Sequence, residues 1–192
     1  MLTERYAQAV AYALQVHASQ LRRGTNVPYA SHLLGVSSLV LEAGGDQDLA
    51  IAALLHDSAE DHGGERRLEE IAARFGDRVA AIVRECSDWL PQPGVAKPSW
   101  QERKLAHLER LRSASADSLT VWAADKVNNV RALVVDIERT GVAEMGKFHA
   151  PPDRVLWYYR ANLELLDNAG VSEALLVPLR DAVGRLGDLI EM

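Results

Sequence analysis

The chain has 192 residues, of which 48% are hydrophobic and 25% are charged. This size and balance predict one globular domain over residues 1–192, with enough apolar surface for a single core. The formal net charge of −6 argues against nucleic acid as a partner, because phosphate contacts need clustered Lys and Arg. A small anionic ligand remains compatible with this charge if a metal ion or a local basic patch overrides it.

The chain carries a single cysteine, Cys86, so no internal disulfide can form. This favours a reducing, cytoplasmic environment, and a lone Cys in an apolar stretch is typical of a small core residue. The N-terminal residues 1–5 lack the apolar run of a signal peptide. No segment approaches the roughly 20 apolar residues of a membrane span, so we expect no membrane association.

Helical periodicity dominates the sequence in chain order. Residues 3–21 carry an apolar stripe at i, i+3, i+4 spacing and predict a first helix, and residues 22–29 predict a loop. Capping residues, Gly and Pro bound further helices predicted over 32–43, 47–61, 66–75, 77–88, 118–140 and 151–168, and from residues 100 and 172 onward. Residues 90–98 and 142–151 are predicted to be irregular. No stretch alternates like a strand, so we predict an all-α, compact bundle of eight or nine helices.

The stretch from Ala52 to Asp61, AALLHDSAED, passes directly from apolar to ionisable residues. On a continuous helix His56 and Glu60 share one face, as do Asp57 and Asp61. His56 and Asp57 could bind one ion from the same side, and Glu60 and Asp61 would lie one turn further on, close to a water on that ion. Burying so many acids beside leucines is costly without a partner, and a divalent cation is the natural one.

Two more ligands must come from elsewhere in the chain. His32 stands at the start of a predicted helix, and Asp125 interrupts a later apolar helix. Two His and two Asp form a mixed donor set that favours Mn²⁺, Fe²⁺ or Zn²⁺ over Mg²⁺. Taken singly, each residue could also have a structural role without a metal: Asp125, for example, could be a buried carboxylate paired with Lys126 or Arg131.

The remaining histidines are not predicted to bind the metal. They are His17, His62, His107 and His149. We expect His17 to border the polar face of the first helix, and His62 to face solvent where the acid pair ends.

The motifs together resemble the hydrolase domain of the RelA/SpoT proteins and the small alarmone hydrolases, within the HD superfamily. The matching stretches, in family order, are PYASH (28–32), AALLHDSAED (52–61), FGDRV (75–79), Arg103-Lys104 and ADKVNNVR (124–131). The resemblance is strongest over residues 5–135, and residues 141–192 form C-terminal helices that match less well. Asn128 stands where the family usually has Tyr, which suggests a change in substrate recognition rather than at the metal.

The resemblance implies a helical fold and one bound ion, with Mn²⁺ favoured. It implies removal of the 3′-pyrophosphate from a guanosine alarmone such as ppGpp, by attack of a metal-bound water. The residues that it assigns are His32, His56, Asp57 and Asp125 as metal ligands, Glu60 and Asp61 as the groups that position or activate the water, and Arg22, Arg23, Lys126 and Asn129 as substrate contacts.

Other functions remain open at this stage. The chain could be an HD-type nucleotide phosphatase or a pyrophosphohydrolase with another nucleotide substrate. It could also be a non-catalytic nucleotide-binding module or a plain helical interaction domain. The adjacent Glu60 and Asp61 favour catalysis, because a binding module needs no group that activates water. Trp89 and Trp157 could serve a homo-oligomer interface or the core.

Overall fold

The computed structural model describes residues 1–147 and 150–191. In this part of the chain every regular element is helical, and a single isolated antiparallel bridge joins Leu21 to Pro28. The predicted all-α fold is therefore confirmed. The elements are α1 (Glu4–Val16), α2 (Ala30–Glu42), α3 (Gln47–Leu55), α4 (Ser58–Asp61), α5 (Gly64–Phe75), α6 (Asp77–Cys86), α7 (Trp100–Leu111), α8 (Ala116–Thr140), the 3₁₀ helix η1 (Val142–Lys147), α9 (Pro152–Asn168) and α10 (Glu173–Glu191).

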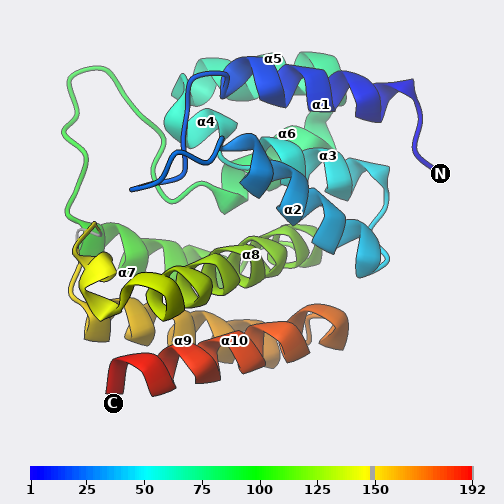
Figure 1. The fold of residues 1–192 in the computed structure, drawn as a ribbon. Coiled ribbons are helices and arrows are strands. Elements are labelled where there is room, and N and C mark those ends of the chain that lie inside the picture. Colours follow the sequence, from blue (N-terminus) through cyan, green and yellow to red (C-terminus); the bar gives the residue numbers. More distant parts are fainter. Residues whose placement is uncertain (148–149, 192) are drawn as a thin grey trace.

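Helix α8 runs across the middle of the molecule (Figure 1). It packs against α2, α3 and α6 on one side and against α9 and α10 on the other. A helix enclosed in this way is apolar around most of its circumference, and α8 buries residues from Ser118 to Ile137. The buried apolar side chains on both sides of α8 form one contiguous cluster. No helix in the described ranges has the length and apolarity needed to cross a bilayer.

The helix predicted over 47–61 is divided in two. Asp46 caps its start as expected, accepting the backbone N–H of Leu49 at 3.0 Å, and every residue from Leu49 to Leu55 is buried. The helix then ends at Leu55, and α4 begins only at Ser58. His56 and Asp57 occupy the junction, so the prediction of one continuous helix through these two residues and the following acids was wrong. In the described part of the chain, α3 and α4 thus stand where one helix was predicted.

Other boundaries differ in smaller ways. Helix α1 ends at Val16 rather than at residue 21, and its C-terminal end is followed by a loop in which Tyr29 N–H donates to Gln20 O at 2.9 Å. The capping box at the start of α7 is confirmed, because Ser99 and Glu102 bond reciprocally to each other's backbone N–H. Residues 142–147 form η1 where an irregular segment was predicted. Cys86 is buried in the core, as predicted.

Candidate metal centre

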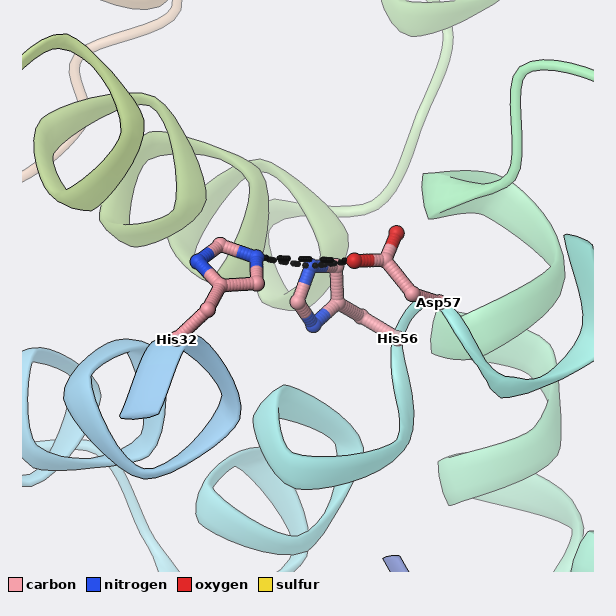
Figure 2. A group of neighbouring side chains, drawn as sticks. All are labelled: His32, His56 and Asp57. Carbon is pink, nitrogen blue, oxygen red and sulfur yellow. Dashed lines mark hydrogen bonds and ion pairs between the residues drawn. The ribbon is translucent and has the colours of Figure 1, made fainter. Parts of the chain in front are cut away.

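Four side chains from three parts of the chain converge beside α8. His32 comes from α2, and His56 and Asp57 come from the α3–α4 junction (Figure 2). The two Nε2 atoms lie 3.3 Å apart, and Oδ2 of Asp57 lies 3.4 Å from His32 Nε2 and 3.0 Å from His56 Nε2. Asp125 Oδ1, from α8, lies 3.2 and 3.5 Å from the same two nitrogens. The structure thus brings the four predicted ligands together.

The separations between these atoms suit a shared ion. The donor atoms of His32, His56 and Asp57 all lie within 4.8 Å of one another, and Asp125 joins them through both imidazoles. Two ligands about 2.1 Å from one ion and at right angles are about 3 Å apart. The distances of 3.0–3.5 Å between each imidazole nitrogen and its neighbouring donors are close to this value.

The hydrogen bonds at the Nδ1 atoms of His32 and His56 are also compatible with a cation bound at the Nε2 atoms. His32 Nδ1 lies 2.8 Å from Asn128 Oδ1, and His56 Nδ1 lies 2.8 Å from the carbonyl oxygen of Ala53. Oxygen acceptors at Nδ1 place the ring protons there, so both Nε2 atoms present lone pairs to each other. Two buried lone pairs facing each other at 3.3 Å need a positive charge between them, which a proton supplies in the metal-free cluster and a divalent ion would supply when bound.

The electrostatics of the cluster favour the same conclusion. His32, His56 and Asp125 are buried. Burial alone would lower the pKa of His56, but the carboxylates of Asp57 and Asp125 outweigh it and raise that pKa well above its ordinary value. Burial alone would raise the pKa of Asp57, and the neighbouring imidazoles instead hold it well below its usual range. Two ionised carboxylates in a buried site attract any available cation.

A second layer of side chains holds the carboxylate ligands. The Tyr29 hydroxyl donates to Asp57 Oδ2 at 2.5 Å. Asn129 Nδ2 donates to Asp125 Oδ1 at 2.5 Å, and the Lys126 ammonium lies 2.7 Å from Asp125 Oδ2 and 3.6 Å from the centroid of the Trp122 ring. Lys126 and Asn129 therefore fix Asp125. The pair with Lys126 was one of the alternatives that the sequence offered for Asp125, whereas the bond from Asn129 was not predicted.

The position of Asn128 differs from the expectation that its substitution affects substrate recognition alone. Its departure from the family pattern suggested an effect on substrate recognition rather than on the metal. The structure instead places Asn128 against His32, where its side-chain oxygen accepts the Nδ1 proton. The substitution therefore bears on the orientation of a predicted metal ligand. The sequence could not show this, because the two residues lie 96 positions apart.

The side chains of Glu60 and Asp61, the last two residues of α4, bond to different neighbours. Glu60 accepts the backbone N–H of Asp88 at 3.0 Å and lies 3.3 Å from the Lys97 ammonium. Burial, followed by the negative charge of Asp88, raises the pKa of Glu60 to about 8. Asp61 is exposed and accepts the side-chain N–H of Gln20 at 2.8 Å.

A cavity of about 920 Å³ adjoins the cluster, and His32, Glu60 and Asp61 form part of its wall. Its size lies in the range of roughly 300–1,000 Å³ that is typical of small-molecule sites. The four predicted substrate contacts, Arg22, Arg23, Lys126 and Asn129, all line it. Among the described residues, seven cationic side chains line it, against four acidic ones (Glu60, Asp61, Asp88 and Asp136); the cationic residues are Arg22, Arg23, Lys97, Arg103, Lys104, Lys126 and Arg131. The wall is thus locally basic although the chain as a whole is acidic.

Two of the remaining histidines lie elsewhere than expected. His17 is buried rather than on a polar face, and its Nδ1 lies 2.6 Å from Gln20 Oε1. His62 also bonds to Gln20, with its Nε2 at 2.8 Å from Oε1. His107 is buried against Trp122, and His149 lies outside the described residues. The bonds of Gln20 to His17 and His62 were not predicted, and the one signal for them in the sequence is the three-residue spacing of His17 and Gln20 just after α1.

Two basic side chains that line the cavity, Arg103 and Lys104, were also not predicted as part of the site. Asp88 is almost fully buried and accepts hydrogen bonds from Arg103 Nη1 at 2.6 and 2.5 Å and from Lys104 Nζ at 2.5 Å. Burial would raise the pKa of Asp88, but these cations hold it well below its usual value. The Arg103-Lys104 pair matched the family pattern, but nothing in the pattern indicated Asp88 as its anchor.

Comparisons with known proteins show the family of the chain. The chain matches the HD domain family over residues 9–147. A guanosine-3′,5′-bis(diphosphate) 3′-pyrophosphohydrolase of Xenopus tropicalis is 36% identical over 129 residues, which cover 66% of this chain and 68% of that protein. A protein of the same name from Aquifex aeolicus is 31% identical over 170 residues, which cover 85% of this chain but only 23% of that protein. The chain thus spans about a quarter of the Aquifex relative.

Solved structures show the same fold. The structure of a metazoan ortholog of SpoT, described as hydrolysing ppGpp, has a TM-score of 0.77 at 26% identity, over 97% of this chain and 98% of that one. The structure of lmo0812 from Listeria monocytogenes has a TM-score of 0.66 at 22% identity, over 84% of this chain and 99% of that one, and it supports the fold alone. The chain therefore belongs to the HD-domain family, among relatives of the guanosine-3′,5′-bis(diphosphate) 3′-pyrophosphohydrolases.

Proposed function

We propose that this protein is a metal-dependent hydrolase that removes the 3′-pyrophosphate from a guanosine alarmone such as ppGpp. One observation carries the proposal: a cluster of two imidazoles and two carboxylates opens onto a basic cavity large enough for a small ligand. The names of the Xenopus and Aquifex relatives support the substrate class. We also propose that residues 1–192 act as one hydrolase domain with a small nucleotide as its partner.

His32, His56, Asp57 and Asp125 would hold one divalent ion, and we propose Mn²⁺ because the resemblance to the RelA/SpoT hydrolase domain implies this ion; the mixed donor set itself also suits Fe²⁺ and Zn²⁺. When bound, such an ion activates water and neutralises charge that develops on phosphoryl oxygens. Asn128, Tyr29 and Asn129 would keep three of the ligands in orientation, because each bonds to one of them.

Hydrolysis forms a bond between a water oxygen and the 3′-phosphorus and breaks the bond from that phosphorus to the 3′-oxygen. The water must lose a proton, and the 3′-oxygen must gain one. Glu60 suits this exchange, because its pKa of about 8 lies close to neutrality and it lines the cavity beside His32. Asp61, on the same wall, would orient the water.

The basic wall would bind the phosphate groups. Arg103 and Lys104 reach the cavity while anchored to Asp88. In the described part of the chain, neither the buried Nε of Arg103 nor the buried hydroxyl of Tyr158 has a hydrogen-bond partner. Both residues line the cavity, so a phosphate oxygen could accept a hydrogen bond from each donor. The Arg22 guanidinium, which also lines the cavity, lies 5.9 Å from the centroid of the Tyr29 ring and could stack on a base.

The test uses purified, Mn²⁺-loaded protein and a panel of nucleotides that includes ppGpp. We expect release of pyrophosphate from ppGpp, and none from the Asp57→Ala variant. Release of orthophosphate would instead indicate a phosphatase. Binding of ppGpp without any product would overturn the enzymatic proposal.

A further inference from the structure

Gln20, which follows α1, contacts the proposed water-orienting residue Asp61. Its Nε2 donates to Asp61 Oδ2 at 2.8 Å. Its Oε1 lies 2.6 Å from His17 Nδ1 and 2.8 Å from His62 Nε2. We propose that Gln20 is a positioning residue for Asp61, and that His17 and His62 fix the orientation of the Gln20 amide. This inference rests on the proposed function, because it assumes that Asp61 handles the attacking water.

The orientation of the amide follows from its neighbours. An ionised carboxylate can only accept hydrogen bonds, so the NH₂ group of Gln20 must face Asp61. The amide oxygen can then only accept, so His17 Nδ1 and His62 Nε2 must both carry protons. Reversing the amide would set its NH₂ group against two N–H donors and its oxygen against a carboxylate. The two imidazoles therefore select one of the two amide orientations.

His17 is held firmly enough to act as this anchor. It is buried, and its Nε2 lies 3.2 Å from the hydroxyl of Ser58, the first residue of α4. Its ring stacks on Tyr29 with centroids 5.3 Å apart and planes inclined by 23°, and Tyr29 in turn bonds to Asp57. Burial lowers the pKa of His17 to about 4, so the ring is neutral at physiological pH and carries one proton. The His17 ring thus contacts both Tyr29, which bonds to Asp57, and Gln20, which bonds to Asp61.

Asp61 needs an external support. It is the last residue of the four-residue α4, and its side chain is exposed. Desolvation and the negative charge of Asp57 raise its pKa, whereas the Gln20 hydrogen bond, His62 and Lys97 act in the opposite direction. The Gln20 N–H therefore holds one carboxylate oxygen in place and favours the charged form, which can accept a hydrogen bond from water.

The first test is kinetic. Gln20→Glu keeps the side-chain length and the acceptor but replaces the donor facing Asp61 with an oxygen. We expect kcat for ppGpp to fall roughly 10- to 100-fold, the usual effect of losing such a support, with KM and bound metal unchanged. In an Asp61→Asn background the same change should have no further effect on the residual rate. Gln15→Glu is the matched control, because it makes the same charge change at an exposed site on α1 and should leave kcat unchanged.

The second test needs no turnover. The pKa of the Asp61 carboxyl is followed by ¹³C NMR in Mg²⁺-loaded parent protein and in a Gln20→Met variant. Loss of the amide donor should raise this pKa, while Asp57, His62 and Lys97 remain in place. An unchanged Asp61 pKa would overturn the inference, as would a Gln20→Glu loss of kcat that persists fully beside Asp61→Asn. A parent protein that leaves ppGpp intact would overturn the proposed function instead, and the NMR result would still decide the role of Gln20.

Discussion

Gly35 offers a way to disturb the metal centre without touching a ligand. It lies in α2, three residues after His32, and packs against Asn128 of α8. A Cβ added to Gly35 would overlap the side-chain nitrogen of Asn128. Because Asn128 Oδ1 accepts the Nδ1 proton of His32 at 2.8 Å, Gly35→Ala should displace this acceptor and release the imidazole.

Gly35→Ala should change folding stability little, because two effects of opposite sign cancel, but it should weaken metal binding. In a helix interior Ala is favoured over Gly by about 1 kcal/mol. Loss of the bond between Asn128 and His32 costs about 1 kcal/mol, so the stability of the metal-free protein should change little. Loss of the support behind a metal-ligating His typically weakens metal binding roughly 10- to 100-fold. That factor corresponds to about 1.4–2.8 kcal/mol of binding free energy.

Calorimetric titration with Mn²⁺ measures the binding, and denaturant unfolding of the metal-free protein measures the stability. Gly184→Ala is the matched control, because Gly184 is an exposed glycine of α10 whose added Cβ meets no described atom within 4 Å. The control should gain up to about 1 kcal/mol of stability with unchanged Mn²⁺ affinity. Parental Mn²⁺ affinity in Gly35→Ala would refute the reasoning that Asn128 holds His32.

Three further changes test other parts of the site. Asp57→Ala should abolish metal binding and turnover, because it removes a donor within 3.4 Å of both imidazoles; ppGpp hydrolysis at the parental rate would contradict the assignment. Lys126→Met should destabilise the metal-free protein by about 3 kcal/mol or more in denaturant unfolding, because Asp125 would stay buried without the ammonium 2.7 Å away. Added Mn²⁺ should restore part of this loss, and no recovery would argue against Asp125 as a ligand. The folded-state pKa of Glu60, about 8, lies above its ordinary 4.5, so the stability that Glu60 contributes below pH 4.5 is lost as the pH rises to about 8. Glu60→Gln should make the stability of the metal-free protein less dependent on pH over this interval, and an unaltered dependence in urea titrations would refute the raised pKa.

Local signals in the sequence predicted the helices well. Asp46 and Ser99 cap helices where their side chains predicted it, because a cap depends only on the next few residues. The break between α3 and α4 could not be predicted in this way. His56 and Asp57 both keep right-handed helical dihedral angles, so the helical spacing continues although the helix does not. The break lies where the side chains meet His32 of another helix, which is a tertiary effect.

The same distinction between local signals and tertiary contacts applies to the residues of the site. Three of the four proposed ligands, His56, Asp57 and Asp125, could be singled out from the sequence because an ionisable group in an apolar stretch stands out within its own segment. Two supports of the ligands, Tyr29 and Asn128, could not be identified in this way, because each bonds to a ligand far along the chain. Lys126 and Asn129, by contrast, lie within four residues of Asp125. Asn128 lies 96 residues from His32, and Gln20 lies 41 residues from Asp61. Periodicity indicates which face of a helix a residue occupies but not which side chain it meets.

The central claim is that His32, His56, Asp57 and Asp125 share one divalent ion. Anomalous diffraction from crystals of the Mn²⁺-loaded protein, recorded at the manganese edge, tests it directly. We predict a single strong peak within bonding distance of both Nε2 atoms and of one oxygen from each carboxylate. A peak elsewhere, or none at this cluster, would contradict the account.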